Sequence, residues 1–567
     1  MARWSRLGVL IAALVLFNST AAHAQASVAG AVKDASGAVL PGVTVEAASP
    51  ALIEKARSVV TDDTGQYKIV DLRPGAYAIT FTLAGFSTVK REGIELTGSG
   101  TTTVNADLKV GTLAETITVT GETPIVDVQT AARQNVLSGE AVASAPTARS
   151  WNGILLLQPG ITGDPNQVQL QPAMIIFGIH GGPIQEGRLL VDGMNVGASR
   201  GGGGVSGYTV DTGNLEEVTF RSSGGLGEAE TGGPYMNVIP KTGGNTFHGS
   251  FVESFSNRSL QGSNYTDELK AKGLRVPGQL LMLYDHDAAL GGPIKKDRLW
   301  FYGIVRYLGQ QQSVPGLYAN ANAGDPTKWT YVPNTALQAR TDQSNRTAST
   351  RLTYQISQRH KLNLFWDEQR SCNGAAWPGA KKTGACRENP DGWIEAGVGA
   401  GPSGANVVAP EAGIYTHGPQ RIQQATWTSP ITNKALLDVG FSAYGSRWGG
   451  NSAPGSPTLD FIQVREQGGS IPGLCYRAGS PLCGGTFLAS TGWIMANTWH
   501  AHFSYVTGSH NFKFGYNGLY DNDNQQSNFA NSQGLVYQFN NGVPYQFGFW
   551  SDGGAMHSVL NWRSVVR

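Results

Sequence analysis

The stretches IIFGIHGGPIQEGRLLVDGMNV, residues 175–196, and LEEVTFRSSGGLGEAETGGPYMNVIPKTGGNTFHGSFVE, residues 215–253, decide the fold of this chain. They hold three short runs typical of strands, at 188–191, 217–220 and 235–239, separated by turn residues and by glycines. Glycine permits positive φ and close approach of one backbone to another. This density of glycine predicts a compact domain enclosed by another part of the molecule.

Several motifs in these stretches follow one another in a fixed order. The residues that carry the motifs are Asp192, Gly193, Glu217, Gly232, Gly233, Asn237 and Lys241. In this order they resemble the plug domain of TonB-dependent outer-membrane receptors, in which an Asp-Gly turn, a Glu-Glu-Val strand and an Asn-Val-Ile-x-Lys-Thr strand precede the barrel. A helix expected over 150–157, capped by Ser150 and stopped by Pro159-Gly160, fits the early part of such a plug. The resemblance implies a plug over residues 124–244.

The chain begins like a targeting segment. Arg3 and Arg6 precede an apolar run at 7–17, and Ala22-His23-Ala24 forms a small-x-small cleavage site. Residues 1–24 are therefore predicted to be a signal peptide. The alternative is an uncleaved anchor, although a membrane-spanning helix needs about 20 apolar residues.

The composition limits the possible partners. The 567 residues include 75 glycines, 15% are charged, and the formal net charge is +1, so no basic field attracts nucleic acid. No later run is long and apolar enough for a membrane helix. A chain of this kind enters a membrane only as a closed barrel, which satisfies its backbone hydrogen bonds in lipid.

Residues 25–110 predict a small β-sandwich. Runs at 28–32, 43–47, 67–70, 77–81 and 102–108 are separated by polar turns. The pattern of Gly30, Pro41-Gly42, Thr61-Asp62 and Pro74-Gly75 is similar to the carboxypeptidase regulatory-like family. That family implies a folding and docking module with no catalytic residues. The Asp62-Asp63 turn is either a solvated turn or a calcium site, and calcium needs six or more oxygen ligands.

The linker at 113–123 contains an alternating segment with two interpretations. Its residues are Glu115, Thr116, Ile117, Thr118, Val119 and Thr120. The segment resembles the TonB box, which in this receptor family binds an inner-membrane, TonB-type energy-transducing protein. An unpaired strand of this kind can also add to the edge of a partner sheet. The second interpretation makes it the last strand of the sandwich.

Residues 245–567 read as paired strands of a transmembrane barrel. In 351–356 and 361–366 apolar and polar side chains alternate, and only four residues join the two runs. The same pattern recurs at 499–505 and 512–517, and further strands are expected at 247–255, 299–307 and 437–444. A soluble sandwich also alternates, but long polar linkers at one end and short turns at the other are typical of outer-membrane barrels. The fold class is therefore mainly β: an N-terminal sandwich, an α/β plug and a partial antiparallel barrel.

The four cysteines predict disulfide bonds within the long linkers. In an exported chain, Cys372 with Cys386 and Cys475 with Cys483 most simply form disulfides. A metal site is the lesser interpretation, because neither pair has zinc-knuckle spacing.

The sequence predicts no enzyme and no cofactor. It carries no HExxH, GxSxG or phosphate-binding glycine loop. His180, His500 and His502 are candidates for ligand or metal binding, but packing or lumen roles are commoner for such histidines. No metal site is therefore assigned.

The resemblance is to the Oar-like branch of the receptor family, which joins a regulatory-like domain, a plug and a barrel. Plugged transporters have about 22 strands, more than residues 245–567 supply, so we expect a chain truncated at its C-terminal end. The expected function is energy-coupled uptake of an unidentified extracellular ligand across the outer membrane. The N-terminal domain would face the periplasm, and the barrel would contact outer-membrane lipid. A non-transporting adhesin or assembly factor is the alternative, and an exported enzyme is the third.

Overall fold

The computed structural model describes most of the chain after the predicted signal peptide. The described residues are 26–34, 36–49, 52, 55–72, 75–96, 101–111, 116–120, 133–145, 147, 149, 151–163, 177–183, 186–197, 206–223, 233–273, 277–357, 359–373, 394–395, 407–432, 435–447, 451–452, 461–478, 493–507, 510–523, 535–549 and 561–565. The predicted signal peptide at 1–24 lies outside them. No helix in this described part is both long and apolar enough to cross a membrane.

The N-terminal part is a sandwich of two sheets. One contains β4 (Gln66–Leu72), β1 (Ala26–Asp34), β7 (Thr101–Thr103) and β8 (Ala106–Leu108). The other runs in the order β3 (Ala56–Val60), β2 (Thr44–Ala48), β5 (Gly75–Thr82), β6 (Thr88–Leu96) and β9 (Thr116–Thr120). Apolar side chains from both sheets form one buried cluster. The expected sandwich is therefore present, although β3 and β6 were not predicted.

The run predicted at 102–108 is divided into β7 and β8 by two residues that bind elsewhere. The Tyr67 hydroxyl donates to the Val104 carbonyl at 2.7 Å, and Ala31 N donates to Asn105 Oδ1 at 2.9 Å. A Cβ on Gly30 would lie 2.0 Å from the Val104 oxygen. Glycine at position 30 therefore permits this close backbone approach.

The plug is built on a five-stranded sheet. Its order is β10 (Arg133–Ser138), β15 (Leu215–Ser223), β16 (Tyr235–Pro240), β13 (Arg188–Val191) and β14 (Met194–Asn195). A separate pair, β11 (Ile161–Gly163) with β12 (Phe177–Ile179), and the short helices α2 (Gly139–Ser144) and α3 (Trp151–Leu156) complete its described elements. The three strand predictions of the opening stretches are confirmed. The helix expected at 150–157 is α3, and Ser150 lies outside the described residues.

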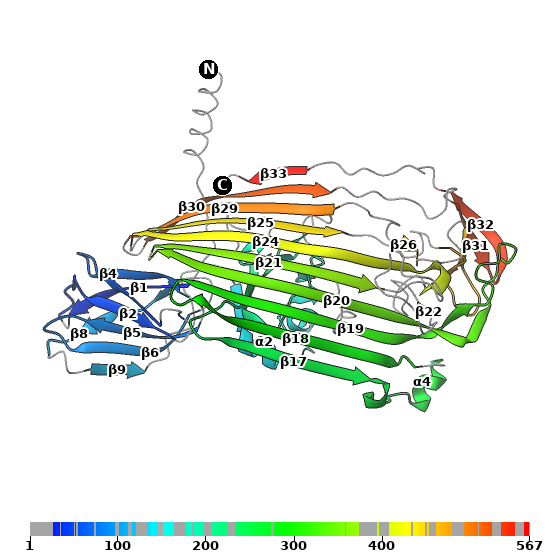
Figure 1. Cartoon of the computed structure of the whole chain (residues 1–567), viewed down its shortest axis with the longest axis horizontal. Helices are drawn as coiled ribbons and strands as arrows, with labels where there is room; N and C mark the ends of the chain where they lie inside the picture. Colours follow the sequence, from blue (N-terminus) through cyan, green and yellow to red (C-terminus); the bar gives the residue numbers. More distant parts are fainter. Residues whose placement is uncertain are drawn as a thin grey trace, which may run out of the picture.

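A long antiparallel sheet forms the wall behind which the plug lies (Figure 1). Its path is β17 (His248–Asn257), β18 (Leu280–Lys295), β19 (Leu299–Asn320), β20 (Pro333–Ser357), β21 (His360–Asn373), β24 (Ile414–Thr432), β25 (Ala435–Arg447), β29 (Trp493–Thr507), β30 (His510–Asp523) and β33 (Asn561–Val565). Two short strands join it, β22 (Ile394–Glu395) beside β20 and β26 (Asn451–Ser452) beside β24. This mainly β architecture agrees with the predicted partial barrel.

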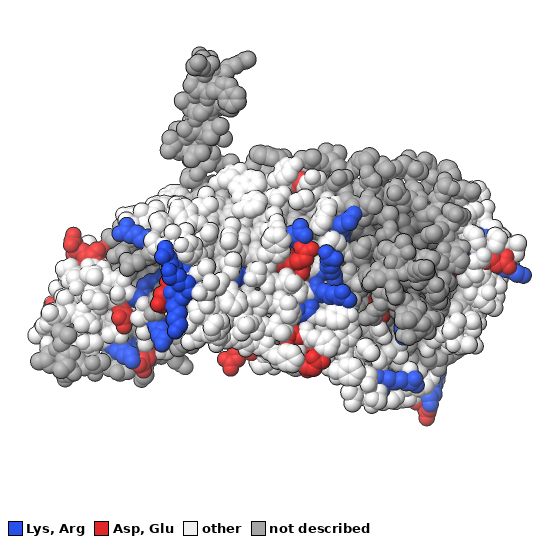
Figure 2. Space-filling view, viewed as in Figure 1, with Lys and Arg blue, Asp and Glu red and all other residues white. Residues whose placement is uncertain are grey.

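The alternation expected along the wall strands is present. Leu364 and Trp366 are exposed on the outer face, whereas Phe365 between them is buried on the face toward the plug. Large parts of the described outer surface carry no charged side chain (Figure 2). Glu253, which breaks the apolar pattern of β17, lies with its Oε2 2.7 Å from Nδ1 of His286 on β18. The outer face is therefore mostly uncharged, and this acidic residue has a partner there.

Some described segments between the wall strands form further strands and short helices that the sequence did not predict. Five strands form a separate sheet at the end of the wall opposite the N-terminal sandwich: β23 (Val407–Val408), β28 (Leu474–Tyr476), β27 (Gln463–Glu466), β31 (Leu535–Asn540) and β32 (Val543–Phe549). The short helices α4 (Asp267–Ala271), η2 (Arg258–Leu260) and η3 (Pro410–Ala412) also lie between wall strands in the chain. Linker segments far apart in sequence thus fold together, and we call these five strands the outer sheet.

Candidate functional site

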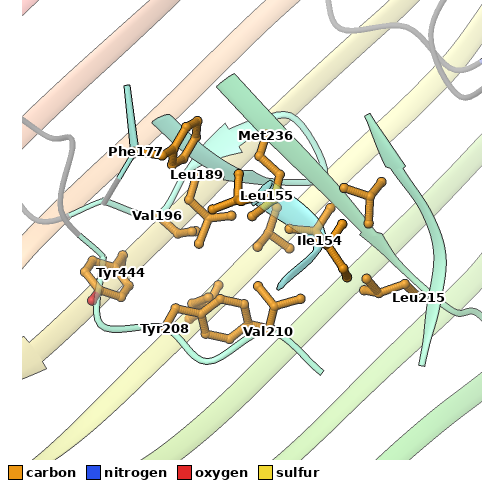
Figure 3. Packing of buried hydrophobic residues seen from close by; sticks show 14 of the residues in the cluster. Ile154, Leu155, Phe177, Leu189, Val196, Tyr208, Val210, Leu215, Met236 and Tyr444 are labelled. Atoms are coloured by element: carbon orange, nitrogen blue, oxygen red, sulfur yellow. The ribbon is translucent and has the colours of Figure 1, made fainter. Parts of the chain in front are cut away.

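The plug and the inner face of the wall share one apolar core. Plug residues such as Ile154, Leu155 and Val210 are buried in a cluster with Tyr444 of β25 and Ile422 of β24 (Figure 3). Tyr444 is completely buried. The plug is therefore packed directly against the wall.

The Asp-Gly turn of the plug has the geometry that its sequence predicts. Asp192 and Gly193 both have positive φ, 49° and 77°, and they join β13 to β14 in a tight hairpin. Two successive residues with positive φ are characteristic of a type I′ turn. Gly193 N donates to Asn237 Oδ1 at 2.8 Å, and the Asp192 carboxylate pairs with Arg351 of β20. The turn thus connects two plug motifs and fastens them to the wall.

The other plug motif residues have different surroundings. Lys241 Nζ donates to the Gly213 carbonyl at 3.2 Å, and Glu217 accepts from the Thr219 hydroxyl at 2.9 Å. A Cβ on Gly233 would lie 2.6 Å from the main-chain carbonyl oxygen of Glu186, so glycine at this position permits the two backbones to approach closely. Gly232 lies outside the described residues. The motifs therefore support the plug's own fold as well as its attachment.

A group of charged residues joins the plug to β18 and β19. We call it the ion cluster; its members are Arg149 and Asp211 of the plug, Asp285 and Asp287 of β18, and Arg306 of β19. Arg306 donates to both oxygens of Asp285, at 2.8 and 2.9 Å. Arg149 lies 3.2 Å from Asp211 and from Asp285, and it also pairs with Asp287. The plug and the wall thus each contribute an arginine and at least one carboxylate.

The backbone conformation of Arg149 and the lack of a side chain at Gly213 allow the guanidinium to reach the ion cluster. The φ of Arg149 is 56°, and the Thr212 hydroxyl donates to its carbonyl at 2.9 Å. A Cβ on Gly213 would lie 2.1 Å from the Arg149 Nη2. Glycine at 213 therefore leaves the space that the guanidinium fills. Sequence analysis did not find Arg149, because its partners lie 62 to 138 positions away.

Uncharged hydrogen bonds join the plug to β21, β24 and β25. Gln369 accepts from Thr209 N and donates to Thr209 O, both at 2.9 Å. Gln424 Nε2 donates to the Val191 carbonyl at 3.1 Å, and Gly207 N donates to the Tyr444 hydroxyl at 3.3 Å. We call these the amide contacts. In these contacts, side chains of the wall form hydrogen bonds with the backbone of the plug.

The segment at 115–120 forms a strand. Residues 116–120 are β9, which runs parallel to β6 at the edge of the second sandwich sheet, with Thr88 opposite Thr116 and Glu92 opposite Thr120. This is the position that the second interpretation predicts. Glu115 lies outside the described residues, and binding of a TonB-type partner to the segment stays a prediction.

The structure also describes two other sets of candidate residues from the sequence, the acidic turn at Asp62 and the cysteines. Asp62 Oδ1 accepts from Thr64 N, the Thr64 hydroxyl and Gln66 N, so this oxygen is used within its own turn. Cys372 and Cys475 are both disulfide-bonded. Their pairing with Cys386 and Cys483 stays a prediction, because those residues lie outside the described part.

These features define a sandwich joined to a plug that is seated on the inner face of an antiparallel wall. Residues 27–109 match the carboxypeptidase regulatory-like domain family. The chain is 29% identical over 381 residues to the TonB-dependent transporter Oar of Myxococcus xanthus, covering 63% of this chain and 34% of that protein. The chain thus spans about a third of the length of this curated relative. The resemblance to an Oar-like TonB-dependent receptor with an N-terminal regulatory-like domain is confirmed.

Solved structures with similarity to the chain include two outer-membrane proteins. The outer membrane transporter YddB of Escherichia coli matches with a TM-score of 0.43 and 13% identity, covering 73% of this chain and 51% of that one. The ferric enterobactin receptor of Pseudomonas aeruginosa matches with a TM-score of 0.40 and 13% identity, covering 69% and 49%.

Proposed function

We propose that this chain is a receptor for energy-coupled uptake of an extracellular ligand across the outer membrane. The observation that carries the proposal is the plug seated on the inner face of the wall and held by the ion cluster and the amide contacts. A plug in this position blocks passage along the wall. Uptake then requires a force that moves it, and no catalytic step is needed.

The outer face of the wall supports a position in lipid. Phe251, Val305, Phe441 and Phe514 are large apolar residues exposed on four different strands. Outward apolar residues that alternate with inward ones are expected of a wall in contact with lipid. The sandwich, at the end with the short turns, then faces the periplasm.

We propose that the segment at 115–120 is the part of the chain that a TonB-type protein binds. Within the described residues, β9 is the last strand of its sheet, and its second edge is not paired. A partner strand can add to that edge through main-chain hydrogen bonds. Because the segment precedes the plug in the chain, force applied to it is transmitted toward β10 and the plug.

Binding of the partner tests this proposal. The full chain in lipid nanodiscs would be titrated with the purified periplasmic domain of a TonB-type protein from the same cell. A variant with residues 115–120 replaced by a Gly-Ser segment is expected to bind at least about tenfold more weakly. The control has the same replacement at 261–266, beyond the opposite end of the wall, and is expected to bind like the parent.

Equal binding by the parent and the 115–120 variant would contradict energy coupling through this segment. The non-transporting alternative, an adhesin or assembly factor, predicts that result, since neither needs the segment. The ligand is left open in the proposal because binding of the partner does not depend on its identity.

A further inference from the structure

Three metal-ligating side chains meet on the inner face of the wall. They are Asp438, near the start of β25, and His500 and His502, near the middle of the neighbouring strand β29. Asp438 is directly opposite His502 in the register, and Gly440 is opposite His500. One ligand atom from each of the three residues lies within 4.8 Å of the other two.

The two histidines are held in place by their neighbours. They are almost completely buried, and their rings stack with centroids 4.3 Å apart and an angle of 9° between planes. A Cβ on Gly440 would lie 2.3 Å from Cε1 of His500. The absence of a side chain at 440 therefore leaves the space that this ring occupies.

Hydrogen-bond contacts hold the three side chains in place, one between two of the three residues and two to residues outside the set. His500 Nε2 lies 3.1 Å from Asp438 Oδ2, and the Thr428 hydroxyl lies 3.3 Å from Asp438 Oδ1. His502 Nε2 lies 2.9 Å from Asn517 Oδ1 on β30. Thr428 and Asn517, which lie outside the set, are partners of the type that orients a carboxylate or an imidazole ligand in metal sites.

We propose that Asp438, His500 and His502 form a site for one divalent transition-metal ion of the Zn²⁺ type. Two imidazoles and a carboxylate suit Zn²⁺, Ni²⁺ or Cu²⁺, whereas Ca²⁺ and Mg²⁺ prefer oxygen ligands. Ligand bonds of about 2.0–2.2 Å place neighbouring ligand atoms of a tetrahedral site about 3.4 Å apart. The ligands must therefore approach one another by little more than about 1 Å, which side-chain rotation provides.

Zn²⁺ binding to the full chain tests the site. The protein would carry a tag without histidine, be stripped with a chelator, and be titrated calorimetrically with Zn²⁺ alone. Single variants His500→Gln, His502→Gln and Asp438→Asn are each expected to weaken one binding event by at least about tenfold. The matched control is His286→Gln, because His286 also pairs with a carboxylate but lies on the outer face; it is expected to leave that event unchanged.

A second variant keeps all three ligands. Gly440→Ala places a methyl group where the His500 ring lies, so we expect weaker Zn²⁺ binding with an otherwise folded wall. Circular dichroism would confirm that each variant is folded. X-ray absorption of the Zn²⁺-loaded parent should show two imidazole ligands.

Two results would overturn the proposal: a parent that does not bind Zn²⁺, or a triple variant of the three ligands that binds it as tightly as the parent. Neither result depends on partner binding by residues 115–120. The metal site and the proposed uptake function can therefore fail separately.

Discussion

The wall holds the plug by different chemistry on its two sides. On β18 and β19 the ion cluster joins two arginines to three carboxylates, whereas on β21, β24 and β25 the amide contacts carry no charge. Removing one partner from a buried ion group costs about 3–5 kcal/mol, but a neutral hydrogen bond contributes only about 0.5–1.5 kcal/mol. If the plug is pulled as proposed, we expect the amide contacts to break before the ion cluster does.

The largest effect is expected from removing Arg149. Arg149→Met leaves three carboxylates facing Arg306 alone, so the plug should lose about 3–5 kcal/mol of its attachment. Hydrogen exchange followed by mass spectrometry should show lost protection over 206–223. Arg359→Met, at an exposed hairpin turn, is the control and should change nothing; equal protection in both variants would remove the distinction between the two sides.

A smaller effect is expected from crowding the same cluster without removing a charge. Gly213→Ala brings a methyl group onto the Arg149 guanidinium, and overpacking of this kind costs about 1–3 kcal/mol. The same exchange measurement should show partial loss of protection. In Gly262→Ala the added Cβ meets nothing within 4 Å, so this variant should match the parent; a similar response from both would mean that Arg149 moves aside freely.

The amide side is tested by Gln369→Met. This change removes both bonds to the Thr209 backbone, and we expect a loss of about 1–2 kcal/mol. Amide hydrogen exchange should become faster near residue 209, while the segment around Arg149 stays protected from exchange. Gln423→Met, on the opposite face of β24 from Gln424, serves as control. Loss of protection at Arg149 as well would show that the two sides release together.

The smallest effect concerns Lys68, for which the described part of the chain offers no acidic partner. Burial, with repulsion from Lys513 of β30, lowers the pKa of Lys68 in the sandwich to about 8 from 10.5. The unfolded chain then binds this proton more readily than the folded one, so stability falls as pH decreases from about 10.5 to 8. Between about pH 7 and 9 the sandwich should gain about 1 kcal/mol.

Pulse proteolysis in urea would measure that gain at the two pH values. Lys68→Met should remove this pH dependence and stabilise the sandwich at pH 7. If the variant keeps the full pH dependence of the parent, another group is responsible. Loss of the pH dependence in Lys68→Met would show that this lysine destabilises the sandwich, in contrast to the paired charges of the ion cluster, which hold the plug to the wall.

Local rules of backbone and alternation made much of the fold predictable. The Asp192-Gly193 turn needs only two adjacent residues that tolerate positive φ. The faces of β21 follow from alternation alone, as Leu364 and Phe365 show. The strands extend further than expected because their outward residues become polar beyond the apolar band, as at Glu368 and Arg370 of β21. Hydropathy therefore marks the apolar band and not the end of the strand.

The sequence by itself determined the order of sandwich, plug and wall, because each depends on contacts between residues close in the chain or on a repeating pattern. Only the tertiary structure decided what meets across long separations: Arg149 with the β18 carboxylates, Asp438 with the two histidines, and the outer sheet assembled from linkers. The physical reason is that charges and ligand atoms act through space at a few ångströms. Their partners are selected by how the wall packs against the plug, and no local pattern records that distance.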